Sequence, residues 1–174
     1  AVFRAPRELD GRYLLWPAGT TTDAAVPVRL LISEYDQLPE ADPVASEALA
    51  PEADPAFGRH ELAADAPLTV TVDIAGTDPA SRFADHCSGQ ITARRPDVVL
   101  ELGGATPALY LAATAEADTT LLVVDPAGVV HCDDDSNGFD PALAIASAMP
   151  GPHAIWVGSW SGGETRAQLT LSAE

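Results

Sequence analysis

The sequence predicts an all-β fold, an antiparallel β-sandwich. Short runs of β-forming residues recur along the chain, separated by Gly, Pro, Asp and Asn, which are typical of turns. Residues 68–74 alternate apolar and polar side chains with a period of two, as expected of a strand with one buried face. Helical patterns are few, because the Ala-rich runs 45–50 and 144–148 are short and bounded by Pro. Many short, closely spaced strands favour a sandwich.

The other strands expected after residue 60 follow the same pattern. They are residues 97–102, 109–113, 119–124, 129–132, 154–157 and 167–171. The sequence Asp-Pro-Ala-Gly at 125–128 has Pro and Gly in turn-compatible places, and therefore predicts a hairpin. At 174 residues the chain is long enough for one domain with a substantial core.

Three regions are expected along the chain: a hairpin over 1–36, a linker over 37–55 and the sandwich over 56–174. The linker is rich in Pro and acidic residues, a composition that opposes compact packing.

The N-terminal hairpin is predicted from a partial repeat. Residues 11–16 match 151–156 in their Gly and Trp spacing, and residues 28–33 resemble 167–172 with a shift of one residue. Each copy would contribute an inward Trp, Trp16 or Trp156. Chance similarity between two β-hairpins is the alternative interpretation.

A two-stranded hairpin is barely stable alone in water. Residues 1–34 are therefore expected to pack on the main sandwich or on another chain. In the second case the hairpin would complete a sheet of a neighbouring chain by strand addition. The protein would then be an assembly or interaction protein that forms a homo-oligomer through residues 1–34.

The charge of the chain is strongly negative. It has 26 acidic residues against 9 basic ones, a formal net charge of −17, and all basic residues are Arg. Such a field repels nucleic acid and attracts divalent cations and basic partners, so nucleic-acid binding is excluded. No apolar run reaches the roughly 18 residues that a membrane span needs.

The acidic run at 133–138 predicts a calcium site. Asp133, Asp135 and Asn137 before Gly138 reproduce the start of a calcium loop, in which alternate oxygens face one cation and the glycine permits a tight bend. Nearby oxygens of Asp134, Asp140 or Asp118 would add to the shell.

The closing Glu of an EF-hand is missing, since position twelve is Ala144, and the preceding residues are strand-like. We therefore expect a calcium turn between strands. The alternative is a solvated acidic turn without metal.

Two cysteines, Cys87 and Cys132, lie 45 positions apart. A disulfide is the first expectation in an oxidising compartment. Because each follows a His, a zinc site is a second interpretation, but neighbouring strand residues point to opposite faces and the usual zinc spacings are absent. Free thiols are the third.

From residue 54 onward the chain resembles a bacterial pre-peptidase C-terminal (PPC-like) domain. The matching segments are 54–58, 87–89, 96–98, 117–123, 126–128, 132–138, 151, 155–158 and 169–172. The resemblance rests on their order and spacing and covers about two thirds of the chain. The hairpin at 11–34 resembles the C-terminal part of domains of the same family.

The resemblance implies a small jelly-roll-like β-sandwich attached to a secreted or periplasmic protein, without catalytic activity of its own. Similar domains in bacterial collagenases bind calcium and collagen. It also implies the disulfide Cys87–Cys132, because related sequences carry cysteines before a Gly-containing turn and before an acidic run. An accessory module binding a protein or polysaccharide is the function it implies.

Catalytic motifs are absent from the sequence. The run 158–162 lacks the G-x-S-x-G spacing of a nucleophile elbow, and the four histidines form no H-E-x-x-H. We therefore expect no enzyme; an unrecognised hydrolase, with a triad assembled only in space, is the weaker alternative. Trp160 lies in a Gly- and Ser-rich turn, where it would either contact a partner or pack on its own hairpin.

Overall fold

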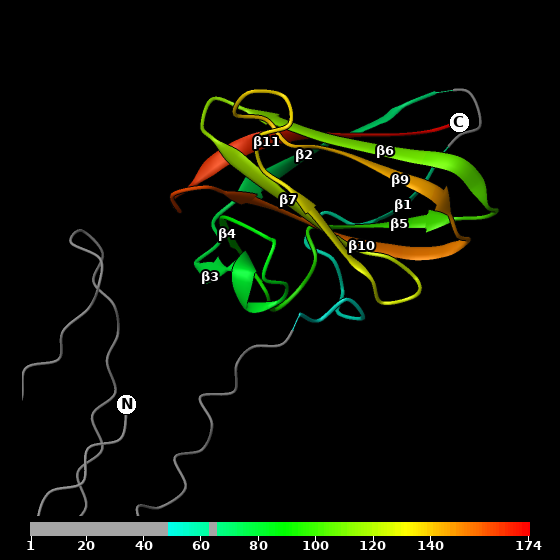
Figure 1. Ribbon diagram of the computed structural model, residues 1–174, viewed down its shortest axis with the longest axis horizontal. Coiled ribbons are helices and arrows are strands. Elements are labelled where there is room, and N and C mark those ends of the chain that lie inside the picture. Colours follow the sequence, from blue (N-terminus) through cyan, green and yellow to red (C-terminus); the bar gives the residue numbers. More distant parts are fainter. Residues whose placement is uncertain (1–48, 63–65) are drawn as a thin grey trace, which may run out of the picture. The chain divides into compact units, whose positions relative to one another are not determined.

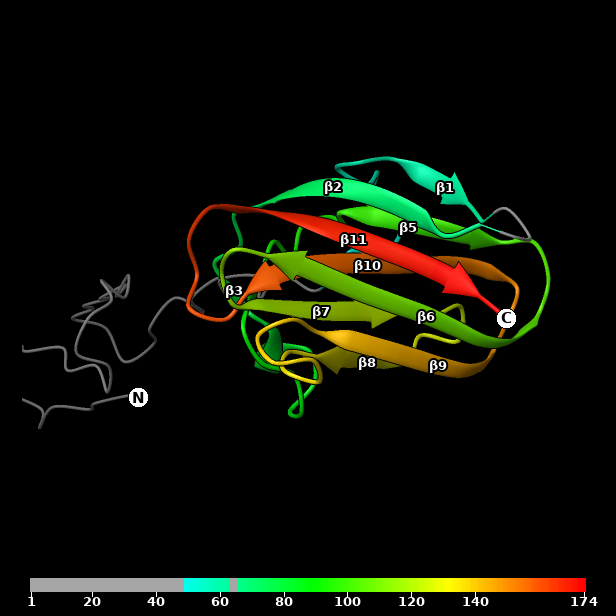
Figure 2. The ribbon, with the colours of Figure 1, turned by 90° about the horizontal axis from the view of Figure 1, so that it is seen from above.

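Two β-sheets packed face to face form the domain (Figures 1 and 2). The computed structural model describes residues 49–62 and 66–174. These ranges contain strands and one short 3-10 helix, η1 (Ala80–Arg82), and no α-helix. The predicted all-β sandwich is thereby confirmed. No helix in these ranges has the length and apolar character needed to cross a membrane. The predicted hairpin 1–36 and linker residues 37–48 lie outside the described residues.

The first sheet, sheet A, has seven strands, and sheet B has four. Sheet A contains β1 (Arg59–Glu61), β3 (Asp78–Pro79), β4 (Gln90–Ile91), β5 (Val98–Leu102), β7 (Thr119–Val124), β8 (Val130–Asp133) and β10 (Gly151–Ser159). Sheet B contains β2 (Leu68–Ile74), β6 (Thr106–Ala115), β9 (Ala142–Ala148) and β11 (Thr165–Ala173).

The last two strands of the chain are central in their sheets. In sheet A, β10 pairs with β5 and β4 and also with β7, which continues to β8. In sheet B the order is β2-β11-β6-β9. Pairing is antiparallel except between β1 and β5, which are parallel, so sheet A is mixed at this edge.

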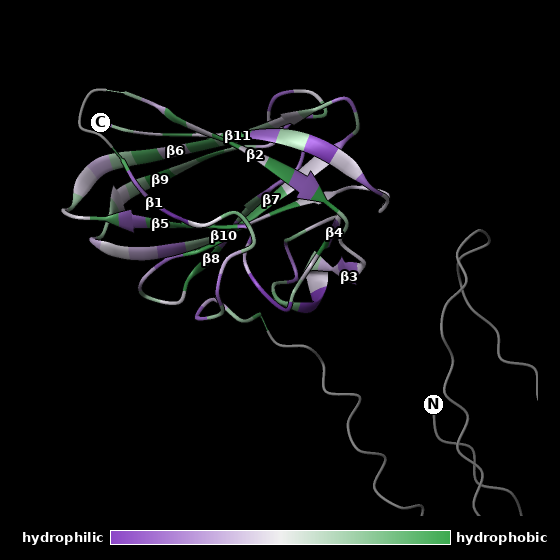
Figure 3. Ribbon diagram, turned by 180° about the vertical axis from the view of Figure 1, so that it is seen from behind, coloured by the Kyte–Doolittle hydropathy of each residue, from purple (hydrophilic) through white to green (hydrophobic). Residues whose placement is uncertain are grey.

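The core between the sheets follows from the alternation in the strands. In β2, Val70, Val72 and Ile74 are buried and the residues between them are exposed. Bands of hydrophobic and hydrophilic colour alternate in the same way along β11 (Figure 3). Side chains from both sheets meet in one apolar cluster that includes Leu100, Leu121 and Leu169. The burial of this cluster is the main stabilising term of the fold.

A second apolar cluster covers the outer face of sheet A. Trp156 is wholly buried there, with Val99 and Leu122 of neighbouring strands, under the segment that carries η1 and β4. The prediction that Trp156 is a core residue is confirmed, although it lies outside the space between the sheets. The covering segment approaches closely: a Cβ on Gly158 would lie 2.1 Å from the Gln90 carbonyl oxygen.

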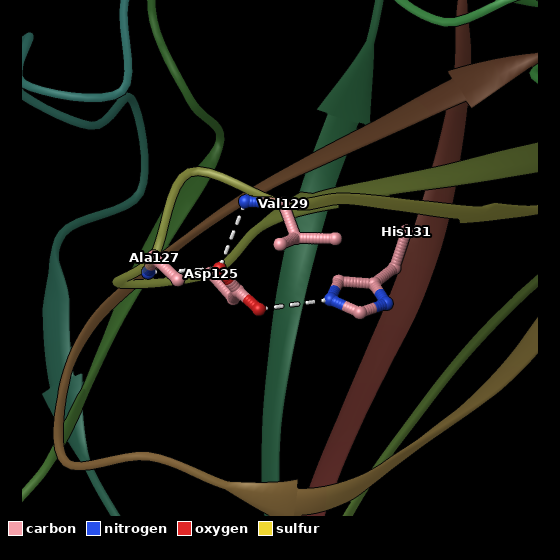
Figure 4. A network of polar contacts seen from close by, with 4 residues as sticks. All are labelled: Asp125, Ala127, Val129 and His131. Atoms are coloured by element: carbon pink, nitrogen blue, oxygen red, sulfur yellow. Dashed lines mark hydrogen bonds and ion pairs between the residues drawn. The ribbon is translucent and has the colours of Figure 1, made fainter.

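The predicted hairpin turn at 125–128 joins β7 to β8 (Figure 4). The Asp125 carboxylate accepts hydrogen bonds from the N–H groups of Ala127 and Val129, each at 2.9 Å, and lies 3.1 Å from His131 Nε2. Burial by itself would raise the pKa of Asp125, but these hydrogen bonds outweigh it and lower that pKa. Gly128 takes the positive φ of 80° that the turn requires.

Residues 49–55, the described part of the predicted linker, lie against the sandwich. Leu49 packs on the second apolar cluster, and the Ala50 N–H donates to the Ala93 carbonyl at 3.4 Å. The next residues continue this attachment, since the Phe57 N–H donates to the Asp97 carbonyl at 2.7 Å. The chain is thus fixed to sheet A before β1 begins.

Candidate functional site

The acidic run connects β8 of sheet A to β9 of sheet B, so it is a turn between strands, as predicted. Gly138 has a φ of +82°, which glycine adopts without strain. The Asn137 N–H donates to the Asp140 carbonyl at 3.1 Å and closes the tip of the turn. The Asp140 carboxylate accepts from the Ala115 N–H at 3.3 Å, which attaches the turn to the end of β6.

Asp133 organises the turn from within. Its Oδ1 accepts from the Ser136 hydroxyl at 2.6 Å, and its Oδ2 accepts from the N–H groups of Ser136 at 3.2 Å and Ala142 at 2.7 Å. One carboxylate therefore holds both the start of the turn and the first residue of β9. A carboxylate offers about four lone-pair sites, so Oδ1 keeps capacity for a cation.

Three consecutive carboxylates gather at the start of this turn. Oxygen atoms of Asp133, Asp134 and Asp135 lie within 4.8 Å of one another. Partial burial raises the pKa of Asp134, and the charges of Asp135, Asp133 and Asp118 raise it further. The group therefore carries uncompensated repulsion that a bound cation would relieve. Asn137 is exposed at the tip.

A disulfide fixes the strand that leads into the turn. Cys87 and Cys132 are bonded, with their Cα atoms 5.6 Å apart, which confirms the disulfide and excludes the zinc and free-thiol interpretations. Cys87 belongs to the segment over the outer face of sheet A, so the bond ties that segment to β8. A second link lies beside it, where the Thr120 hydroxyl donates to the Ser88 carbonyl at 2.8 Å.

Two aromatic side chains are exposed at the end of the domain where the acidic turn lies. Trp160 is 50% exposed, so it does not fold over its own hairpin as a buried residue. Phe139 is 74% exposed, and the sequence analysis did not single it out. The signal was an aromatic residue between Gly138 and Asp140, in a turn with little else apolar.

Two titratable groups are buried at sheet A, Asp97 directly before β5 and His153 in β10. Burial raises the pKa of Asp97 to about 7, although the 2.7 Å hydrogen bond from the Val157 N–H and the charge of Arg95 lower it. Burial lowers the pKa of His153, whose Nδ1 lies 3.2 Å from the Gly151 carbonyl. Sequence analysis missed both, because their burial depends on strand pairing distant in the chain.

No family model matches this chain, and no curated protein matches its sequence. The fold is similar to that of a pre-peptidase C-terminal domain. That domain belongs to a collagenase from Bacillus anthracis; the two share 13% identity and a TM-score of 0.45 over 66% of this chain and 92% of the domain. This agrees with the resemblance predicted from the sequence.

A second similar structure is PliG from Aeromonas hydrophila, a periplasmic lysozyme inhibitor of g-type lysozyme. It shares 12% identity and a TM-score of 0.44 over 67% of this chain and 94% of the inhibitor.

Proposed function

We propose that this chain is a non-catalytic β-sandwich module of an extracytoplasmic protein, and that its acidic turn binds calcium as a structural ion. The main support for this proposal is the group formed by Asp133, Asp134 and Asp135, whose oxygen atoms lie within 4.8 Å of one another. Carboxylate oxygens are the ligands that calcium prefers.

Repulsion within the group supports a cation there. The pKa of Asp134 is raised by burial and by the neighbouring carboxylates, so the ionised form is disfavoured until a positive charge arrives. Asp133 is already oriented by Ser136 and Ala142, which reduces the ordering that binding would require. Asp118, Asn137 and Asp140 would complete the shell as predicted from the sequence.

The disulfide supports an extracytoplasmic location, because such bonds persist mainly in oxidising compartments. A non-catalytic role is supported by the His131–Asp125 pair, because this His–carboxylate pair holds a turn together. The Asp125 carboxylate also accepts two backbone N–H groups of the β7–β8 turn, so this pair has a structural task there.

Thermal unfolding of chelator-treated protein tests the metal site. Addition of about 1 mM calcium should raise the melting temperature by several degrees, because only the folded turn assembles the ligands, and magnesium should do so less. Asp134→Asn and Asp135→Asn should remove the calcium effect. Glu61→Gln, which likewise replaces a carboxylate by an amide but on β1, is the matched control and should keep the calcium effect.

An unchanged melting curve in calcium would reject the metal site. Asp133→Asn separates the two tasks of that residue. It should lower the melting temperature in chelator as well, because the hydrogen bonds to Ser136 and Ala142 weaken without metal.

A second candidate function is assembly by strand addition. Among the described residues, β9 is at the edge of sheet B and pairs only with β6. Its sequence, ALAIASA, has no charge or Pro to protect that edge. If residues 1–34 of one chain pair with this edge of another, deletion of residues 1–34 should reduce the mass of the protein in solution to that of a monomer. A monomeric full chain would reject this candidate.

A further inference from the structure

Three turns meet at one end of the sandwich. β6, β8 and β10 all end there, so the connections 116–118, 134–141 and 160–164 lie at the same end (Figure 2). The three connections contain Glu116, Asp118, Asp134, Asp135, Asp140 and Glu164, and no Arg, Lys or His. These three turns therefore carry negative charge and no basic residue of their own, whereas the ring of His86 lies within 4.8 Å of the Cys132 sulfur, two residues before Asp134.

The backbones of Phe139 and Trp160 are hydrogen-bonded to the backbones of Thr119 and Asp118, which are consecutive in the chain. The Thr119 N–H donates to the Phe139 carbonyl at 3.1 Å, and the Trp160 N–H donates to the Asp118 carbonyl at 3.0 Å. Both side chains remain exposed beside the carboxylates. A calcium ion needs oxygen ligands and gives no reason for aromatic surface, so the calcium site leaves these two residues unexplained.

Strand register places Trp160 beside two of the carboxylates. Ser159 is opposite Thr119, so Trp160 is opposite Asp118, and residues opposite each other share one face of a sheet. Leu121 is opposite Asp133, so continued pairing places Asp134 opposite Thr120, on the same face as Asp118 and diagonal to it. Consistent with this, the charge of Asp118 acts on Asp134. Trp160, Asp118 and Asp134 thus lie at the neighbouring ends of β10, β7 and β8, each one residue beyond its strand.

This arrangement suits a guanidinium group. A guanidinium is planar, stacks on aromatic faces and pairs with carboxylates, whereas a neutral apolar ligand would leave the charges unused. We propose that this end of the sandwich binds a basic protein segment through an Arg side chain that stacks on Trp160 and pairs with Asp118 and Asp134. The formal net charge of −17 would favour the approach of such a partner.

The inference goes beyond the proposed function by naming a class of partner. Calcium and the Arg side chain would compete for Asp118 and Asp134, so the peptide should bind best without calcium. A direct test is titration of the full chain with a short synthetic peptide of alternating Arg and Gly, followed by amide NMR with chelator present. Shifts should be confined to the three turns and the adjoining strand ends. A peptide with Lys in place of Arg should bind more weakly, because the stacked planar contact is lost.

Substitutions then test the row itself. Trp160→Ala, Asp118→Asn and Asp134→Asn should each weaken binding about fivefold, and Trp160→Phe should retain most of it. The matched controls are Val129→Ala, an exposed apolar residue at the other end, and Glu61→Gln on β1; both should bind as the unchanged chain does.

Equal weakening by Glu61→Gln and Asp118→Asn would reduce the binding to net charge and overturn the proposal. Shifts outside the three turns and the adjoining strand ends would also overturn it. A neutral oligosaccharide that shifts the same turns would replace the proposal with sugar stacking on Trp160. Because the titration contains chelator, its result is independent of the calcium melting experiment, and either proposal can fail alone.

Discussion

Asp97 is the residue whose protonation should affect stability most directly. Its pKa is about 7 in the folded protein against an ordinary value of 3.8, so the folded state binds the proton more tightly than the unfolded chain between these values. The free energy of unfolding should therefore fall as pH rises through this window, by at most about 1.4 kcal/mol per pH unit from this group.

Asp97→Asn should remove this dependence, because the amide oxygen can still accept from the Val157 N–H and carries no charge. Urea unfolding at about pH 5 and about pH 8 checks it: relative to the unchanged chain, the variant should gain stability at the higher pH. His153 acts in the opposite sense, since its lowered pKa reduces stability as pH falls, but it is present in both proteins and cancels in the difference. A difference that is the same at both pH values would contradict the prediction, and Asp85→Asn, at an exposed position, is the control.

At the scale of elements, the disulfide joins a strand to the segment that covers it. Cys87→Ser with Cys132→Ser should lower the free energy of unfolding by about 2–5 kcal/mol, because the unfolded chain regains the freedom of a long closed loop. Reductant should lower the melting temperature of the unchanged chain to that of the double variant. Reductant that leaves the unchanged chain as stable as before would show that the bond contributes nothing.

Some elements could be predicted from the sequence because their signal is local. The runs 68–74 and 119–124 have the bounds of β2 and β7, since their alternation or β-branched content is strong. β9 was not predicted, because Ala has a weak strand preference and its strand state depends on pairing with β6. The two- and three-residue strands β1, β3 and β4 depend on distant partners and carry no pattern of their own.

The candidate site divides in the same way. Its carboxylates and the turn at Gly138 follow from residue spacing, whereas the effect of the Asp118 charge on the pKa of Asp134 depends on β7 and β8 being neighbours. The exposure of Phe139 likewise depends on where the turn leaves sheet A. The internal hydrogen bonds of Asp133 were not foreseen, because a calcium-loop pattern assigns that residue only to the metal.

At the scale of the whole molecule, chain order differs from spatial order. β10 and β11, the last strands made, lie between earlier strands in sheet A and sheet B. During synthesis from the N-terminus, the earlier strands would therefore wait without the partners that join them. Sheet A lacks its central strand until β10 is available, and sheet B until β11 is available, so the earlier strands of both sheets should pair late in folding.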